Sequence, residues 1–194
     1  MKWLLLSLNL SLHAAFIWGR YIVFRIDGPP ARGVRIIEFS AALSMIVGGT
    51  LIALRPAVSL PLDLLAVACA VLSGTVFAWG VTTIGCGRLT AAFSDDAPAE
   101  LITSGPFHFV RNPFYVSYLL AYLQAVLASH SPWAILPLLG MWCIYRRAAG
   151  LEEQKFQHSH LAKTYRRYAA CTGRFFPLHV LRRDHGGFKL STLP

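Results

Sequence analysis

The chain has 194 residues, 55% of them hydrophobic and only 14% charged, and its 18 Lys and Arg against 9 Asp and Glu give a net charge of +9. A soluble domain usually carries about a quarter charged residues, so this composition excludes an ordinary water-soluble globule, and it also excludes a disordered tail, a collagen and a disulfide-rich secreted module. We therefore expect one integral membrane domain over residues 1–194, with its positive charge outside the bilayer core.

Five apolar runs predict an all-α, polytopic fold with five transmembrane helices and a cytoplasmic carboxyl-terminal helical segment. The predicted spans are residues 3–24, 36–54, 64–84, 113–128 and 132–145. The third run gives about 30 Å of helix, which matches the hydrocarbon core, whereas the last two give only about 24 and 21 Å. Because residues 129–131 alone separate these two, we expect a helical hairpin that either crosses the bilayer or stops short of it. A cleaved signal peptide is the rival interpretation of the first run, although its apolar stretch is too long.

The distribution of basic residues predicts the orientation. With five spans, one side receives Lys2 and Arg55, and the other side receives every remaining Lys and Arg. The positive-inside rule then places the amino terminus outside and the carboxyl terminus in the cytoplasm, in a plasma (inner) membrane or the endoplasmic reticulum. We expect these charges to face lipid headgroups rather than nucleic acid, because no basic recognition helix or zinc-ligand spacing accompanies them. The 4 cysteines form no Cys-x-x-Cys pair, so we expect no metal site.

Some residues inside the runs are expected to pack helices together. Small side chains recur every four residues in the third run and would let a neighbouring helix approach closely: Ala66, Ala70, Gly74 and Ala78. Three polar residues in apolar runs are expected to make interhelical hydrogen bonds: Asn9, His13 and Gln124. Glu38, near the start of its run, is expected either to pair with Arg35 or to be hydrated.

Chemistry-bearing residues gather in two segments on the predicted cytoplasmic side, residues 85–115 and 146–177. In the first, Arg111 and Asn112 precede the fourth helix, whose amino terminus carries free N–H groups and partial positive charge. In the second, Glu152 and Glu153 follow the last span, where two adjacent carboxylates are costly unless a positive group pairs with them. Arg146 lies two helical turns before Glu153, and Arg111 is another possible partner. Alternatively, both carboxylates are simply solvated among neighbouring Lys and Arg.

Several motifs follow one another in this half of the chain. They are Leu101-Ile102-Thr103-Ser104-Gly105-Pro106, Val110-Arg111-Asn112-Pro113-Phe114-Tyr115, Glu152-Glu153, Tyr165-x-x-Tyr168 and Gly173-Arg174-Phe175-Phe176-Pro177. In this order they resemble the isoprenylcysteine carboxyl methyltransferase family, whose carboxyl-terminal arrangement phospholipid and small-thiol methyltransferases share. The resemblance covers roughly residues 80–178, and the first two spans are matched by hydropathy alone.

The resemblance implies an S-adenosylmethionine-dependent membrane methyltransferase. It further implies carboxyl O-methylation of a lipophilic or lipidated acceptor such as an isoprenylcysteine carboxylate, with the cofactor at the cytoplasmic face and held within about residues 85–178. The implied cofactor contacts are Ala99, Glu100, Leu101 and Ile102 through their backbone, together with Phe107, Asn112, Pro113, Tyr115, Glu152 and Glu153. The implied catalytic residues are Arg111, Arg146 and Glu153.

These residue types suit the cofactor. Glu153 could accept hydrogen bonds from ribose hydroxyls or an ammonium, Phe107 and Tyr115 could face the adenine, and the helix start with a nearby Arg could bind the carboxylate. The chain departs from the family at two positions: Asn112 stands where His is usual, and Ala149 stands where an Arg normally precedes the second Glu by four residues. Arg146 or Arg147 would have to replace that Arg, so the acceptor need not be a prenylated cysteine carboxylate.

Two other functions fit parts of the pattern. Membrane sterol and steroid reductases carry a similar Arg-His-Pro-x-Tyr segment and bind NADPH there, although the adjacent Glu152 and Glu153 and the short chain favour the methyltransferase. A non-enzymatic membrane scaffold with a degenerate pocket is the third interpretation, and Asn112 and Ala149 are its main support.

Overall fold

The structure, a computed structural model, describes residues 1–23, 32–55, 59–85, 98 and 100–177. Within these ranges every regular element is helical, and the only strand-like pairing is an isolated bridge between Val110 and Gly173, so the all-α prediction is confirmed. In chain order the elements are α1 (Lys2–Val23), α2 (Arg32–Leu54), α3 (Leu60–Ile84), η1 (Gly105–His108), α4 (Pro113–Ser129), η2 (Pro132–Ala134), α5 (Ile135–Gln157) and α6 (Ala162–Cys171).

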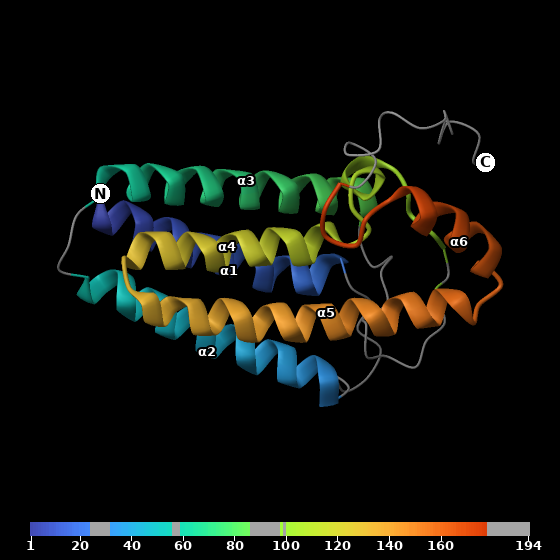
Figure 1. The fold of residues 1–194 in the computed structure, drawn as a ribbon, viewed down its shortest axis with the longest axis horizontal. Coiled ribbons are helices and arrows are strands. Elements are labelled where there is room, and N and C mark those ends of the chain that lie inside the picture. Colours follow the sequence, from blue (N-terminus) through green and yellow to red (C-terminus); the bar gives the residue numbers. More distant parts are fainter. Residues whose placement is uncertain (24–31, 56–58, 86–97, 99, 178–194) are drawn as a thin grey trace.

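The five long helices lie lengthwise against one another, and α6 lies beyond the end opposite the amino terminus (Figure 1). α4 is central because it contacts α1, α2, α3 and α5. The sequence predicts a helical segment after the fifth apolar run, and residues 151–156 are indeed helical, as part of the end of α5. Among the described residues, two helices, α2 and α3, are long and apolar enough to cross a membrane, and α4 is a shorter apolar helix.

The α3 face that packs into the bundle differs from the predicted stripe of small residues. Ala66 and Ala70 are buried as expected, but Ala78 is exposed. The buried face continues instead through Ser73, Phe77 and Gly80. The helix turns by about 100° per residue, so a strict four-residue repeat drifts off one face, whereas mixed steps of three and four stay on it.

Interhelical hydrogen bonds form at two of the three polar residues predicted to make them. The Asn9 side-chain amide donates to Gln124 Oε1 at 2.9 Å, and Gln124 Nε2 donates to the Leu5 carbonyl at 3.1 Å, which joins α1 to α4. The prediction is wrong for His13, whose Nδ1 bonds at 2.8 Å to the Asn9 carbonyl of its own helix. Glu38 pairs with Arg20 of α1 at 3.2 Å rather than with Arg35, since the neighbouring helix brings that guanidinium within reach.

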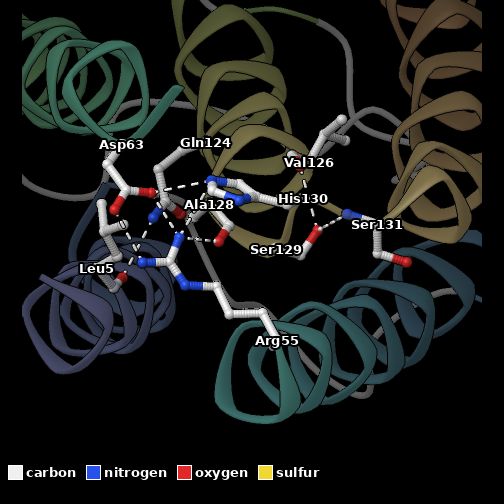
Figure 2. Close-up of polar contacts among 9 residues, drawn as sticks. All are labelled: Leu5, Arg55, Asp63, Gln124, Val126, Ala128, Ser129, His130 and Ser131. Atoms are coloured by element: carbon white, nitrogen blue, oxygen red, sulfur yellow. Dashed lines mark hydrogen bonds and ion pairs between the residues drawn. The ribbon is translucent and has the colours of Figure 1, made fainter. Parts of the chain in front are cut away.

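A buried ionic cluster closes the amino-terminal end of the bundle (Figure 2). The sequence places Arg55 among the loop charges, but the side chain is only 7% exposed. It makes a bidentate ion pair with the fully buried Asp63, in which Nη2 donates to Oδ2 at 2.8 Å. Arg55 Nη1 also donates to the Ala128 carbonyl at 2.7 Å, and His130 Nε2 lies 3.0 Å from Asp63 Oδ1. The cluster therefore joins the end of α2, the start of α3 and the end of α4, and it neutralises a carboxylate that would be costly to bury alone.

Candidate functional site

The candidate site lies at the opposite end of the bundle, where the carboxyl-terminal segment crosses the start of α4. The Arg111 amide donates to the Gly173 carbonyl at 2.8 Å, and the Asn112 amide donates to the Arg174 carbonyl at 3.2 Å. The Asn112 side chain repeats the second contact, its Nδ2 donating to the same carbonyl at 3.2 Å. These bonds bring together two segments that lie 62 residues apart in sequence.

Glu153 is clamped between two guanidinium groups. Arg111 Nη2 donates to Glu153 Oε1 at 3.0 Å, and Arg174 donates to both carboxylate oxygens, with Nε 2.8 Å from Oε1. Arg111 Nη1 also reaches the carbonyls of Ala169 and Thr172, at 2.9 and 3.0 Å. Glu153 thus orders the junction of α4, α5 and the segment after α6, and its bond raises the pKa of Arg174. The predicted partner Arg111 is present, whereas Arg174, part of the quoted Gly-Arg-Phe-Phe-Pro motif, is a partner that the sequence analysis missed.

Glu152 has different surroundings from its neighbour. Its Oε1 accepts a hydrogen bond of 2.8 Å from the Tyr115 hydroxyl, which is its one hydrogen-bond partner in the described part of the chain. Burial raises the pKa of Glu152 to about 7, although the Tyr115 bond and the charge of Lys155 act in the other direction. The Tyr115 ring stacks on Tyr145 of α5, with centroids 4.9 Å apart. A partly buried carboxyl whose pKa is raised toward neutrality, and that bonds to no guanidinium in the described part of the chain, is a suitable counter-group for a bound cation.

Aromatic rings flank the Glu153 clamp. Phe156 of α5 stacks on Tyr165 of α6 with centroids 4.9 Å apart and planes 8° from parallel. The charges of Glu153, Arg111 and Arg174 all act on Tyr165, which places it beside the clamp, and burial raises its pKa above the usual range. Phe107, which the resemblance assigns to the adenine, packs in a buried cluster with Phe77, Ile84 and Phe114. Its carbonyl accepts a 2.6 Å hydrogen bond from the Tyr168 hydroxyl, which joins η1 to α6.

The other predicted site residues are placed as follows. Pro113 is buried at the first position of α4, and Leu101 and Ile102 are half-buried, Ile102 against the Phe107 cluster. Glu100 is exposed, and Ala99 lies outside the described residues. Arg146 is exposed on α5 and is not among the groups that bond to Glu153. Arg111 and Arg174, which approach from other segments, therefore pair with Glu153 in place of Arg146.

The chemistry of these side chains fits S-adenosylmethionine, whose sulfonium and ammonium are positive and whose carboxylate is negative. Glu152 offers a half-buried carboxyl to the positive part, and Arg111 and Arg174 offer N–H groups to the carboxylate. Glu153 has less to offer directly, because a carboxylate has about four lone-pair sites and three guanidinium hydrogen bonds already occupy it. Within the described ranges, no three His, Cys, Asp or Glu side chains are grouped as a metal site.

Comparison with known proteins adds a family match. The family model described as phospholipid methyltransferase matches residues 62–167, more than half of the chain. The matched region runs from the start of α3 into α6 and contains Arg111, Tyr115 and both adjacent glutamates. No curated protein matches the chain.

Proposed function

Because this chain belongs to the phospholipid methyltransferase family, we propose that it is an S-adenosylmethionine-dependent integral membrane methyltransferase that acts on a lipophilic acceptor. The observation that carries the proposal is the meeting of Arg111, Glu153 and Arg174 beside the hydrogen-bonded pair of Tyr115 and Glu152. Family membership favours this function over the reductase and the scaffold, and related isoprenylcysteine enzymes point to the same cofactor.

The two glutamates have separate roles in this proposal. Glu152 faces the cofactor's positive charge, and its bond to Tyr115 fixes the carboxyl orientation. Glu153 is a positioning residue that holds Arg111 and Arg174, whose remaining N–H groups bind the cofactor's carboxylate. Asn112 is also a positioning residue, since its amide holds the Arg174 backbone. This task needs a donor rather than a titrating group, so an amide can take the place of the family's usual histidine.

The bound cofactor would supply a methyl group attached to a sulfonium sulfur. A lone pair of the acceptor would form the new bond to the methyl carbon, and the carbon–sulfur bond would break to leave a neutral thioether. The protein then has to align the acceptor and exclude water. The backbone of Ala99, Glu100, Leu101 and Ile102, together with Pro113, completes the contact set that we propose. The catalytic role of Arg146 stays a prediction, and the turnover rate of the Arg146→Ala variant tests it.

We also propose five membrane spans, four within α1 to α4 and the fifth over residues 132–145 of η2 and the first part of α5, with the amino terminus outside and the carboxyl terminus in the cytoplasm. The bundle geometry supports this topology, because α6 lies at the opposite end of the bundle from the start of α3 (Figure 1). The Arg55 cluster is at the start of α3, and the Arg111 clamp joins the start of α4 to the segment after α6. The cofactor would then be bound at the cytoplasmic end.

The proposal is tested by calorimetry of the detergent-solubilised protein with S-adenosylhomocysteine and, separately, with NADPH. We expect S-adenosylhomocysteine to bind and NADPH not to bind. Transfer of tritiated methyl groups from S-adenosylmethionine into a total lipid extract, measured in proteoliposomes, then shows turnover. Binding of NADPH alone would indicate the reductase, and binding of neither would indicate the scaffold.

A further inference from the structure

The hydrogen-bonded pair of Tyr115 and Glu152 joins α4 to α5 next to the Glu153 clamp. Tyr115 is in the first turn of α4, and its hydroxyl donates to Glu152 Oε1 at 2.8 Å. In the topology that we propose, this turn is at the cytoplasmic end of α4, the depth at which the head group of a bilayer lipid lies. A phenolic hydroxyl can accept hydrogen bonds as well as donate one, so the Tyr115 oxygen still has a lone pair for a second partner.

Of the two adjacent carboxylates, Glu152 is the one that can take up a proton without disturbing the site. Glu153 accepts three hydrogen bonds from Arg111 and Arg174, and a proton on it would break up the clamp. Glu152 bonds to no guanidinium among the described residues, and its Oε2 has no hydrogen-bond partner there. One of its oxygens therefore holds Tyr115, and the other is left for the cofactor's positive charge.

The surroundings of Glu152 suit a group that gains and loses a proton. Burial raises its pKa to about 7, and the charge of Glu153 acts in the same direction, whereas the Tyr115 hydrogen bond and the charge of Lys155 lower it. The titratable side chains that interact with it electrostatically come from α4, α5 and α6: Tyr115, Tyr118, Glu153, Lys155 and Tyr165. A proton acceptor works best when its pKa is near the working pH. Because Glu152 is half-buried and lies beyond the fifth proposed span, its proton can leave to the cytoplasmic water.

The position that recognises an anionic acceptor in related enzymes carries no charge here. Ala149, where an Arg is usual, is fully buried in a cluster that contains Tyr115 and Tyr145. Arg111 and Arg174 are both bonded to Glu153 and are assigned to the cofactor's carboxylate. The groups that remain, a phenolic hydroxyl and a carboxylate, suit an acceptor that has a proton to lose.

We propose, on the premise of the methyltransferase function, that the reacting nitrogen, oxygen or sulfur of the acceptor carries a proton when it binds, and that Tyr115 and Glu152 remove this proton. A lone pair of that atom forms the bond to the methyl carbon while the carbon–sulfur bond breaks, and its proton passes to the Tyr115 oxygen. The original hydroxyl proton of Tyr115 moves to Glu152 Oε1. Tyr115 thus ends as a neutral phenol, and Glu152 ends as a neutral acid that holds one proton for each methyl group transferred.

The charge of the cofactor couples the two events. In the complex that we propose, the Glu152 carboxylate faces the sulfonium, whose positive charge favours the ionised carboxylate. Methyl transfer leaves a neutral thioether and removes that charge. The proton affinity of Glu152 then increases at the step in which the acceptor has to lose its proton.

This coupling is measured by calorimetry of the detergent-solubilised full chain at pH 7. Binding of S-adenosylmethionine and of S-adenosylhomocysteine is titrated in phosphate and in Tris, whose different ionisation enthalpies report the protons exchanged. Because S-adenosylmethionine alone carries the sulfonium charge, we expect it to release more protons, by up to about half a proton per site. Glu152→Gln should remove this difference, whereas Glu38→Gln, the same substitution on α2 away from the candidate site, should retain it.

Turnover separates proton removal from cofactor binding. In the assay of tritiated methyl transfer into a total lipid extract, Tyr115→Phe should lower kcat about 100-fold at pH 7.5 and leave the KM for S-adenosylmethionine within about threefold of the wild type. Tyr118→Phe is the matched control, since Tyr118 lies one turn further along α4 and donates no hydrogen bond to Glu152. Its kcat should stay within about twofold of the wild type.

The pH profile of kcat distinguishes proton removal from a structural role. Wild-type kcat should level off above pH 8, where Glu152 is ionised, whereas that of Tyr115→Phe should keep rising up to pH 9, by up to about tenfold per pH unit, because hydroxide then has to take the proton. A structural role for the Tyr115 hydroxyl would lower the whole profile without changing its shape. Binding of S-adenosylhomocysteine by each variant checks the fold.

Equal proton release by the two ligands in the wild type, or a Tyr115→Phe profile parallel to that of the wild type, would overturn the inference. The calorimetric comparison needs no acceptor, so it decides the role of Glu152 whatever the lipid extract supplies. Failure of the wild type to bind either ligand would instead contradict the proposed function, so the two failures are distinguishable.

Discussion

At the scale of single residues, two adjacent glutamates differ because a helix turns each successive side chain by about 100°. Glu153 points to the junction with the carboxyl-terminal segment and is neutralised by two guanidinium groups. Glu152 points to α4, where burial raises its pKa to about 7 and Tyr115 is its hydrogen-bond partner. The same residue type therefore serves as a structural anion at one position and as a titrating group at the next.

We predict that cofactor affinity depends on the ionisation of Glu152. Burial raises its pKa to about 7, so protonation below that pH removes the negative charge, and S-adenosylhomocysteine affinity should fall by about tenfold in total between pH 8.5 and 5.5. Calorimetric titrations from pH 5.5 to 8.5 measure this dependence. Glu152→Gln should abolish it and weaken binding at pH 8 by about tenfold, the loss expected for one charged hydrogen bond.

Tyr115→Phe provides a second measurement of the same effect. The Tyr115 hydrogen bond lowers the pKa of Glu152, so its removal should move the midpoint of the pH dependence upward. A wild-type affinity that is flat across this range, or a Glu152→Gln variant that retains the slope, would contradict the assignment.

At the scale of elements, close approach of α1 and α3 depends on a glycine that the sequence pattern does not single out. Gly19 packs against the ring of Phe77, and a Cβ atom built on Gly19 collides with that ring. Phe77 is itself 5% exposed and is held by Phe16 and Phe114, with ring centroids 5.0 and 5.7 Å away. The ring therefore has little room to move.

We predict that Gly19→Ala destabilises the bundle. Overpacking typically costs about 1–3 kcal/mol, which exceeds the roughly 1 kcal/mol that Ala gains over Gly in a helix. Thermal unfolding in detergent, followed by circular dichroism, should show a lower Tm. Gly140→Ala on α5 is the matched control, because a Cβ there meets no atom within 4 Å, and its Tm should stay equal or rise. Equal Tm changes in the two variants would show that the α1–α3 contact is looser than the packing indicates.

At the scale of the whole molecule, the two ends of the bundle differ in how much basic charge is exposed. At the amino-terminal end, Arg55 is buried, forms an ion pair with Asp63 and donates a hydrogen bond to the Ala128 carbonyl. At the other end, Arg146, Arg147, Lys163, Arg166 and Arg167 are exposed in addition to the Arg111 clamp. This asymmetry strengthens the positive-inside argument, since it leaves even less exposed basic charge at the end assigned to the outside.

We predict that Trp133 lies outside and Lys163 in the cytoplasm. Trp133→Cys in η2, at a position 69% exposed, and Lys163→Cys on α6 are introduced separately after the native cysteines are replaced by Ser. A membrane-impermeant maleimide applied to intact cells should label Trp133→Cys and should label Lys163→Cys only after permeabilisation. The reverse pattern would invert the topology, and protection of both positions in intact cells would show that the α4–α5 hairpin does not reach the outer face.

The sequence by itself determined the class of the protein, the helical segments and the family, because hydrophobic runs and ordered local motifs are readable without long-range contacts. It also pointed to Arg111, Glu152 and Glu153 as candidate site residues, and the structure brings Arg111 and Glu153 into contact. Only the tertiary structure decided which guanidinium meets which carboxylate: Arg174 rather than Arg146 joins Arg111 on Glu153, Glu38 meets Arg20, and Arg55 is buried on Asp63. Helical periodicity relates residues on one helix, whereas these partners come from different segments, and their pairing depends on how the helices pack.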